Sequence, residues 1–312
     1  MPASRSGMHT ALTRTAALSL LGLCLATMPA RADDTVAPAR PGEILDLQSG
    51  ETLSPGDLYE RLNRRKLILI GEQHDNPEHH AVESLLLEEL ITPGTHAVLE
   101  MLGPELPLDE LSVTSSRDEL ESALRSGTEG WDWDSYGRIY YQILQQGGKL
   151  VSGNLGREQI QAIYEGGDAQ LSQREQESVA AIGSDIRGRI GAEIREQHCN
   201  AIAADKLDSM VEIQLARDAR MASQLDRYLG IKPAILLAGS YHARKDLGVP
   251  QHLKSDDSAV ILLVPVNDSG ELPENETALS PKLADYIWFT SSGLERDYCA
   301  GAASDAEAAA TQ

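Results

Sequence analysis

The chain has 312 residues with 27 basic and 48 acidic side chains, a formal net charge of −21, and 41% hydrophobic residues. This acidity repels phosphate backbones and anionic lipid surfaces, so it excludes nucleic acid as a partner and favours solubility and cation binding. The length and apolar content are sufficient for one large domain, or for a domain with an insertion.

The first segment, residues 1–32, has the layout of a secretory signal peptide. Arg5 and Arg14 precede an apolar run from Ala16 to Met28, and Ala30-Arg31-Ala32 supplies the small residues of a cleavage site. The run is shorter than the roughly 20 residues of a spanning helix. We expect a soluble mature chain, periplasmic or secreted, with 24 basic against 48 acidic residues.

The chain contains three cysteines. Cys24 lies in the apolar run, where a lipid anchor would attach, but Leu23 replaces the small residue that precedes a lipobox cysteine. We therefore expect cleavage after Ala32 and no lipid anchor. Cys199 and Cys299 would remain in an oxidising compartment. A disulfide between them is favoured over two buried free thiols because a single pair leaves no odd thiol.

The N-terminal part of the mature chain predicts an arm, a helix, a strand and a second helix. Residues 33–52 are poor in apolar residues, which is typical of a surface arm. Ser54-Pro55 begins a short helix that runs to Leu62. Leu67–Ile70 is a continuous apolar run ended by Gly71, as in a strand buried on both faces of a parallel sheet. A helix over Pro77–Leu90 follows.

The alternation of strands and helices then continues to the C-terminal region. Helical patterns cover about 108–126, 135–146 and 158–164, and further strands are expected at Ala97–Leu102, Leu150–Gly153, Ala234–Ala238, Ala259–Pro265 and Tyr286–Thr290. Only helical patterns occur between them at about 170–230, which predicts a helical insertion. We expect an α/β fold over 53–299, with a doubly wound, mostly parallel sheet and helices on both faces, then a disordered tail at 300–312.

Ionisable side chains follow the carboxyl ends of the predicted strands, where open α/β sheets bind ligands. Two Gly-x-x-His turns, one after each of two strands, each place an imidazole at this edge. With two glutamates they form a set suited to a divalent first-row metal or to general acid/base catalysis. The candidate catalytic and metal-binding residues are Glu72, His74, Glu100 and His242.

Other candidates surround this set. His79 and His80 are either solvated capping residues or ligands at the mouth of the site. Trp131 and Trp133 precede a helix, either as a hydrophobic staple with Asp134 or Ser135 as the N-cap, or as an aromatic wall. Tyr136 follows, and tyrosinate is a haem ligand.

The combination of segments resembles the ChaN-like family of the haem-binding uptake, Tiki-like superfamily. The segments are LILIGEQHDNPEHH (Leu67–His80), VLEML with Glu100, WDWDSY (Trp131–Tyr136), Asn154, and GSYHARKDLGVP (Gly239–Pro250). The resemblance covers about residues 60–290. It implies haem binding in iron uptake, with a tyrosine as the iron ligand, two haems held between two protomers, and an outer-membrane uptake system as partner.

The resemblance leaves the tyrosine open among Tyr136, Tyr140, Tyr141 and Tyr241. Haem is a dianion, so basic residues near the edge are candidates for its propionates. The candidate haem-binding residues are therefore Tyr136, Tyr241, His79, His80, Arg157 and Arg244.

The wider superfamily implies a second function. Tiki-type metalloproteases and erythromycin-esterase-like hydrolases carry similarly placed Gly-x-x-His turns and a glutamate. By that resemblance the chain would be a hydrolase dependent on a metal such as Mn or Zn, with Glu72 or Glu100 as general base. A non-catalytic interaction domain is the third hypothesis. Because rim residues support little core, we expect His242→Ala to leave the fold intact.

Overall fold

The computed structural model describes residues 39–230, 232–272, 279–291 and Cys299. The predicted signal peptide, with Cys24, and the predicted tail at 300–312 lie outside these residues. Among the described residues, no helix combines the length and the apolar character needed to cross a membrane.

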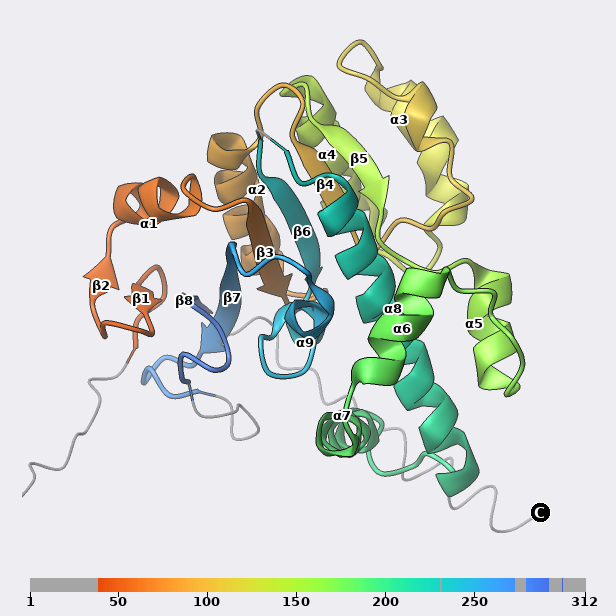
Figure 1. Ribbon diagram of the computed structural model, residues 1–312. Coiled ribbons are helices and arrows are strands. Elements are labelled where there is room, and N and C mark those ends of the chain that lie inside the picture. The colour runs from red at the N-terminus through yellow and green to blue at the C-terminus, as the bar shows by residue number, and fades with distance from the viewer. Residues whose placement is uncertain (1–38, 231, 273–278, 292–298, 300–312) are drawn as a thin grey trace, which may run out of the picture. The chain divides into compact units, whose positions relative to one another are not determined.

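The described strands form one mixed sheet in the order β2-β1-β8-β7-β3-β6-β4-β5 (Figure 1). The strands are β1 (Ile44–Asp46), β2 (Thr52–Leu53), β3 (Leu67–Glu72), β4 (His96–Leu99), β5 (Lys149–Ser152), β6 (Ala234–Gly239), β7 (Ser258–Val266) and β8 (Tyr286–Ser291). β3 pairs in parallel with both β6 and β7, and the chain winds outward from it in both directions. The predicted doubly wound, mostly parallel α/β fold is confirmed.

Helices connect the strands. The α-helices of the described residues are α1 (Pro55–Leu62), α2 (Pro77–Leu90), α3 (Arg117–Leu124), α4 (Trp133–Gln145), α5 (Arg157–Tyr164), α6 (Gln173–Ala181), α7 (Ser184–Gln197), α8 (Ala204–Arg227) and α9 (Ser240–Ala243). Three short 3₁₀ helices accompany them: η1 (Leu108–Glu110), η2 (Arg125–Gly127) and η3 (Val249–His252). Helices α5, α6 and α7 contact α8 and lie to one side of the sheet in Figure 1.

Alternate residues of each central strand enter different cores. Ile68 and Ile70 of β3 pack with α1, α2 and α4, whereas Leu67 and Leu69 pack on the opposite face with α8 and α9. A third, smaller core joins α7 and α8. Because both faces of β3 are covered, the strand has the continuous apolar sequence that the parallel-sheet prediction required.

Part of the predicted surface arm belongs to the sheet instead. β1 pairs antiparallel with β8, and Ile44, opposite Trp288, is fully buried. A second antiparallel pair joins β1 to β2 at the edge. A strand of three residues is too short to show the alternation from which strands are predicted.

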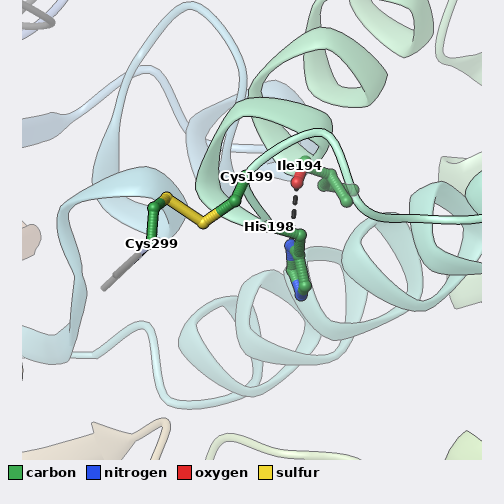
Figure 2. Close-up of a disulfide and its surroundings, with 4 residues drawn as sticks. All are labelled: Ile194, His198, Cys199 and Cys299. Carbon is green, nitrogen blue, oxygen red and sulfur yellow. Dashed lines mark hydrogen bonds between the residues drawn. A yellow bond between two sulfur atoms is a disulfide. The ribbon is translucent and has the colours of Figure 1, made fainter. Parts of the chain in front are cut away.

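A disulfide joins Cys199 to Cys299, as the cysteine count predicted (Figure 2). Cys199 follows α7 in the left-handed region, with φ +57°. The preceding His198 donates from Nδ1 to the carbonyl oxygen of Ile194, at 2.8 Å. The bond therefore ties the chain beyond β8 to the end of α7, across 100 residues of sequence.

Candidate functional site

The carboxyl ends of β3, β6 and β4 lie side by side. Glu72, the last residue of β3, pairs in register with Gly239, the last residue of β6. Glu100 follows β4, and its carboxylate accepts the N–H of Gly239 at 2.8 Å. The strand register alone therefore brings both predicted glutamates to one edge of the sheet.

The two Gly-x-x-His turns interlock. A Cβ on Gly71 would lie 2.7 Å from the Cβ of Ala243 and 3.0 Å from the Cα of Ser240, both in the second turn. A Cβ on Gly239 would lie 2.9 Å from Nε2 of His74, in the first turn. At Gly71 the close neighbours include backbone, so a side chain is excluded there, whereas at Gly239 the close neighbour is the end of the His74 side chain.

The first turn presents His74. Its Nδ1 contacts Oε1 of Glu72, which also accepts a hydrogen bond from the hydroxyl of Tyr136 at 2.9 Å. Nε2 lies 3.8 Å from Oε2 of Glu100, and the ring packs edge-on against Trp131 with centroids 4.7 Å apart. The side chain of His74 remains 39% exposed, so the first turn offers an oriented imidazole at the surface.

Carboxylates set the charge of His74. Burial opposes protonation of its ring, but the neighbouring Glu72 and Glu100 outweigh that effect and raise the pKa of His74 to about 9. The imidazole is therefore cationic at neutral pH, and any metal that binds it must displace a proton.

The second turn places His242 in the interior, with only 6% of its side chain exposed. Nδ1 donates to Asp218 at 2.5 Å, and Nε2 lies 3.3 Å from Oε1 of Glu100. Although burial opposes protonation, these two carboxylates raise the pKa of His242 to about 10. Both ring nitrogens are thus occupied, which makes His242 a buried imidazolium between two carboxylates.

Asp218, on α8, was not identified from the sequence. Burial raises its pKa to about 6, against the opposing effect of His242. Burial acts in the same direction on Glu100, but His242, His74 and the Gly239 N–H prevail and hold the pKa of Glu100 well below its usual range. Asp218 stands between the buried Leu215 and Ala222 of α8. The sequence signal for Asp218 was a carboxylate at a position within the apolar stripe of a predicted helix.

His80 and Glu83, one turn apart on α2, extend the cluster beneath the rim. Nδ1 of His80 lies 3.0 Å from Oε2 of Glu83, and Nε2 lies 3.0 Å from the carbonyl oxygen of His74. Glu83 is fully buried, and burial together with Glu72 raises its pKa to about 8. Like Asp218, Glu83 was missed although it interrupts an apolar stripe.

His79, predicted as a haem-binding residue, is fully buried. Its Nδ1 accepts the N–H of Gln73 at 2.8 Å, and its Nε2 bonds the hydroxyl of Thr290 at 2.9 Å. Burial lowers its pKa to about 3, so the ring is neutral. With both nitrogens hydrogen-bonded inside the protein, His79 fastens α2 to β8.

The candidate tyrosines differ in accessibility. Tyr136 is buried and donates to Glu72, and Tyr140 is buried in the core. Burial raises the pKa of both above the usual range. Tyr241 is half-buried beside α7 and α8, with the Arg244 guanidinium 5.2 Å from its ring centroid. Its hydroxyl is buried, and burial together with the nearby Glu193 raises the pKa of Tyr241 above the usual range.

The two predicted arginines also differ. Arg244 is buried and bonds Asp246 at 2.9 and 3.0 Å, so its charge is already balanced inside the protein. Arg157 is exposed at the start of α5 and has no ion pair within the described part of the chain. Only Arg157 is therefore free to meet an anionic group from solution.

The N-cap of α4 is neither of the residues predicted. Asp132 caps the helix by accepting the N–H of Ser135 at 3.1 Å. Trp133 is the first residue of the helix, so the capping position falls on Asp132. Trp131 is thereby left outside the helix, against His74 and Tyr136.

The carboxyl rim of this doubly wound α/β sheet thus gathers imidazoles, carboxylates and aromatic rings, at the edge where open α/β sheets bind their ligands. Residues 58–253 match the family described as "Haem-binding uptake, Tiki superfamily, ChaN". The chain therefore belongs to that family, which confirms the resemblance seen in its motifs.

Among solved structures, the chain resembles one described as "Cofacial heme binding to ChaN of Campylobacter jejuni". The identity is 26%, the TM-score is 0.64, and the match covers 80% of this chain and 98% of the other. A type III effector, HopBA1, matches at 11% identity and a TM-score of 0.38, over 76% of this chain and 92% of the effector. No curated protein matches the chain significantly.

Proposed function

We propose that the chain is an exported haem-binding protein of iron or haem uptake, and that it binds haem at the carboxyl rim with His74 facing the iron. The observation that carries the proposal is the half-exposed imidazole of His74, oriented by Glu72 and Tyr136 beside Trp131. Family membership and the cofacial haem described for the Campylobacter protein support it.

The residues present fit the needs of haem. An imidazole whose Nδ1 is held by a carboxylate is a more basic ligand through Nε2, and Nε2 of His74 makes no hydrogen bond among the described residues. Trp131 supplies an apolar ring beside it. Of the two arginines predicted to meet the propionates, Arg157 is the exposed one. Haem bound there would supply the iron as a Lewis acid for the imidazole.

Two protomers are part of the proposal. A stacked pair of haems would be enclosed if two rims faced each other, and stacking would bury the faces that one protomer leaves exposed. Light scattering should then give a monomer mass without hemin and a dimer mass with it. Dimers that form equally without hemin would contradict this arrangement.

Hemin titration tests the proposal. The mature protein should show a saturable Soret shift, and His74→Ala should weaken binding at least tenfold, which is about 1.4 kcal/mol. His96→Gln is the matched control, because His96 lies at the amino end of β4, away from the rim. Tyr241→Phe tests one of the four tyrosines among which the family's iron ligand was left open. Should both His74→Ala and Tyr241→Phe titrate like the parent protein, the rim is not the haem site.

Hydrolysis is the second candidate function, and the chain of contacts from Asp218 through His242 to Glu100 favours it. A buried imidazolium between two carboxylates can hold or pass a proton. Glu72 lies at the same edge of the sheet, and its Oε2 has no hydrogen-bond partner within the described part of the chain. Glu72→Gln should then abolish Mn- or Zn-dependent hydrolysis of an ester and peptide panel. Absence of both hydrolysis and a Soret shift would favour the interaction-domain hypothesis.

A further inference from the structure

Glu72, His80 and Glu83 converge beneath the rim. One ligand atom from each lies within 4.8 Å of the other two. Glu72 comes from the end of β3, whereas His80 and Glu83 lie one turn apart on the same face of α2. This set differs from the one predicted from the Gly-x-x-His turns, with which it shares only Glu72.

The hydrogen bonds of His80 determine its tautomer. Nε2 lies 3.0 Å from the carbonyl oxygen of His74, which can only accept, so Nε2 carries the proton. In the neutral ring, Nδ1 then has a lone pair directed at Oε2 of Glu83, 3.0 Å away. Two lone pairs at this distance require a cation between them, either a proton or a metal ion.

The carboxylates add a second, independent observation. The side chains of both Glu72 and Glu83 are fully buried. Among the residues that the structure describes, Oε2 of Glu72 and Oε1 of Glu83 have no hydrogen-bond partner. Buried carboxylates are ordinarily paired or metal-bound, because an isolated buried charge is costly. These two carboxylate oxygens, beside one oriented imidazole, are therefore available as ligands for a cation.

We propose that Glu72, His80 and Glu83 bind a divalent first-row cation, Mn²⁺, Fe²⁺ or Zn²⁺, through Nδ1 of His80 and the two carboxylates. A mixed set of nitrogen and oxygen donors suits these ions, and two carboxylates balance the charge of the ion. The carbonyl of His74 holds the far nitrogen of His80, the outer contact that metal-binding histidines have.

The cation site goes beyond haem binding but is connected to the rim. Oε1 of Glu72 holds both Tyr136 and His74, whereas Oε2 faces the proposed cation. The carboxylate of Glu72 would thus contact the cation through one oxygen and the exposed imidazole of His74 through the other. The cation would in this way fix the orientation of that imidazole. The side chain of His80 is 10% exposed, so the site is not sealed from solvent.

Direct cation binding tests the proposal. Mature protein stripped with chelator is titrated with Mn²⁺, Zn²⁺ or Co²⁺ by calorimetry, and the Co²⁺ absorption spectrum reports nitrogen and oxygen donors. One cation should bind per chain. Glu83→Gln, which keeps the shape and removes the charge, should weaken binding at least tenfold. Glu88→Gln is the matched control, since Glu88 is an exposed glutamate on the same helix.

Further variants separate this site from its alternatives. His74→Ala should retain the cation, whereas a site built on the Gly-x-x-His turns would lose it. If Glu83→Gln does not fold, His80→Asn removes the nitrogen donor and its Co²⁺ signature instead. Equal cation affinity in the parent protein and Glu83→Gln would overturn the proposal. So would a parent protein that binds no cation and shows a protonated-carboxyl infrared band that Glu83→Gln lacks.

Discussion

The two Gly-x-x-His turns have the same sequence pattern but opposite environments. His74 of the first turn keeps 39% of its side chain exposed and meets Glu72 at the surface. His242 of the second turn keeps 6% and is enclosed by Asp218 and Glu100. The difference arises because α9 begins directly at Ser240 and folds His242 under α8, whereas the first turn continues as a loop before α2.

The two turns therefore have different roles. The first turn offers an imidazole to a ligand, and the second holds a buried positive charge between the carboxylates that line the site. The two turns contact each other, because His74 of the first lies against Gly239 of the second and Ser240 of the second lies against Gly71 of the first.

Removing the buried imidazole should have the largest effect. His242→Ala leaves Asp218 and Glu100 as uncompensated buried carboxylates, so the free energy of unfolding should fall by about 3–5 kcal/mol. This replaces the expectation that the fold would be unaffected, because His242 is not an open rim residue. His74→Ala should cost less than about 1 kcal/mol. Urea unfolding of both variants measures the contrast, and equal losses would remove the distinction between the turns.

The two glycines should respond unequally to a methyl group. In Gly71→Ala the new Cβ would meet Leu262 at 2.6 Å, Ala243 at 2.7 Å and the backbone of Ser240 at 3.0 Å, which should cost about 1–3 kcal/mol. In Gly239→Ala the close contact is the ring of His74, which can move. We expect near-normal stability there but weaker hemin binding. A normal hemin affinity in Gly239→Ala would show that the position of His74 is unimportant.

The pH dependence of stability should reveal the buried imidazolium. The pKa of His242 rises from about 6.5 in the unfolded chain to about 10, so its contribution is complete below pH 6.5 and is lost as the pH rises towards 10. One proton gives a slope of about 1.4 kcal/mol per pH unit. Urea unfolding at pH 6.5, 8 and 9.5 measures it. His74, whose pKa is raised to about 9, contributes to the same limb, so His242→Gln should reduce the slope without abolishing it. An unchanged slope would assign the alkaline loss to other groups.

Removing the phenolic hydroxyl of Tyr136 should cost less stability than the changes at His242 and Gly71. Tyr136→Phe deletes one hydrogen bond to Glu72 and leaves that carboxylate in contact with His74, so a loss of about 1 kcal/mol is expected. Thermal unfolding measures it. If Tyr136 were itself the iron ligand, hemin binding would be abolished in this variant rather than modestly weakened.

The sequence predicted which residues lie at the rim of the sheet but not how deeply each of them is buried. Glu72, His74, Glu100 and His242 were predicted to share one edge, and the structure joins them in a chain of contacts. Their partners Asp218 and Glu83 were missed because each lies on a helix, far along the chain or inside an apolar stripe. His79, predicted to bind haem, is fully buried, which its position at the start of a helix did not indicate.

The sequence by itself determined the parallel sheet, since continuous apolar runs such as Leu67–Ile70 are stable only when both faces are covered. It also determined the turns at the strand ends and the pairing of Cys199 with Cys299. Only the tertiary structure decided which imidazole is exposed. That depends on α8 crossing above the second turn and on strand register, which are long-range contacts that no local pattern records.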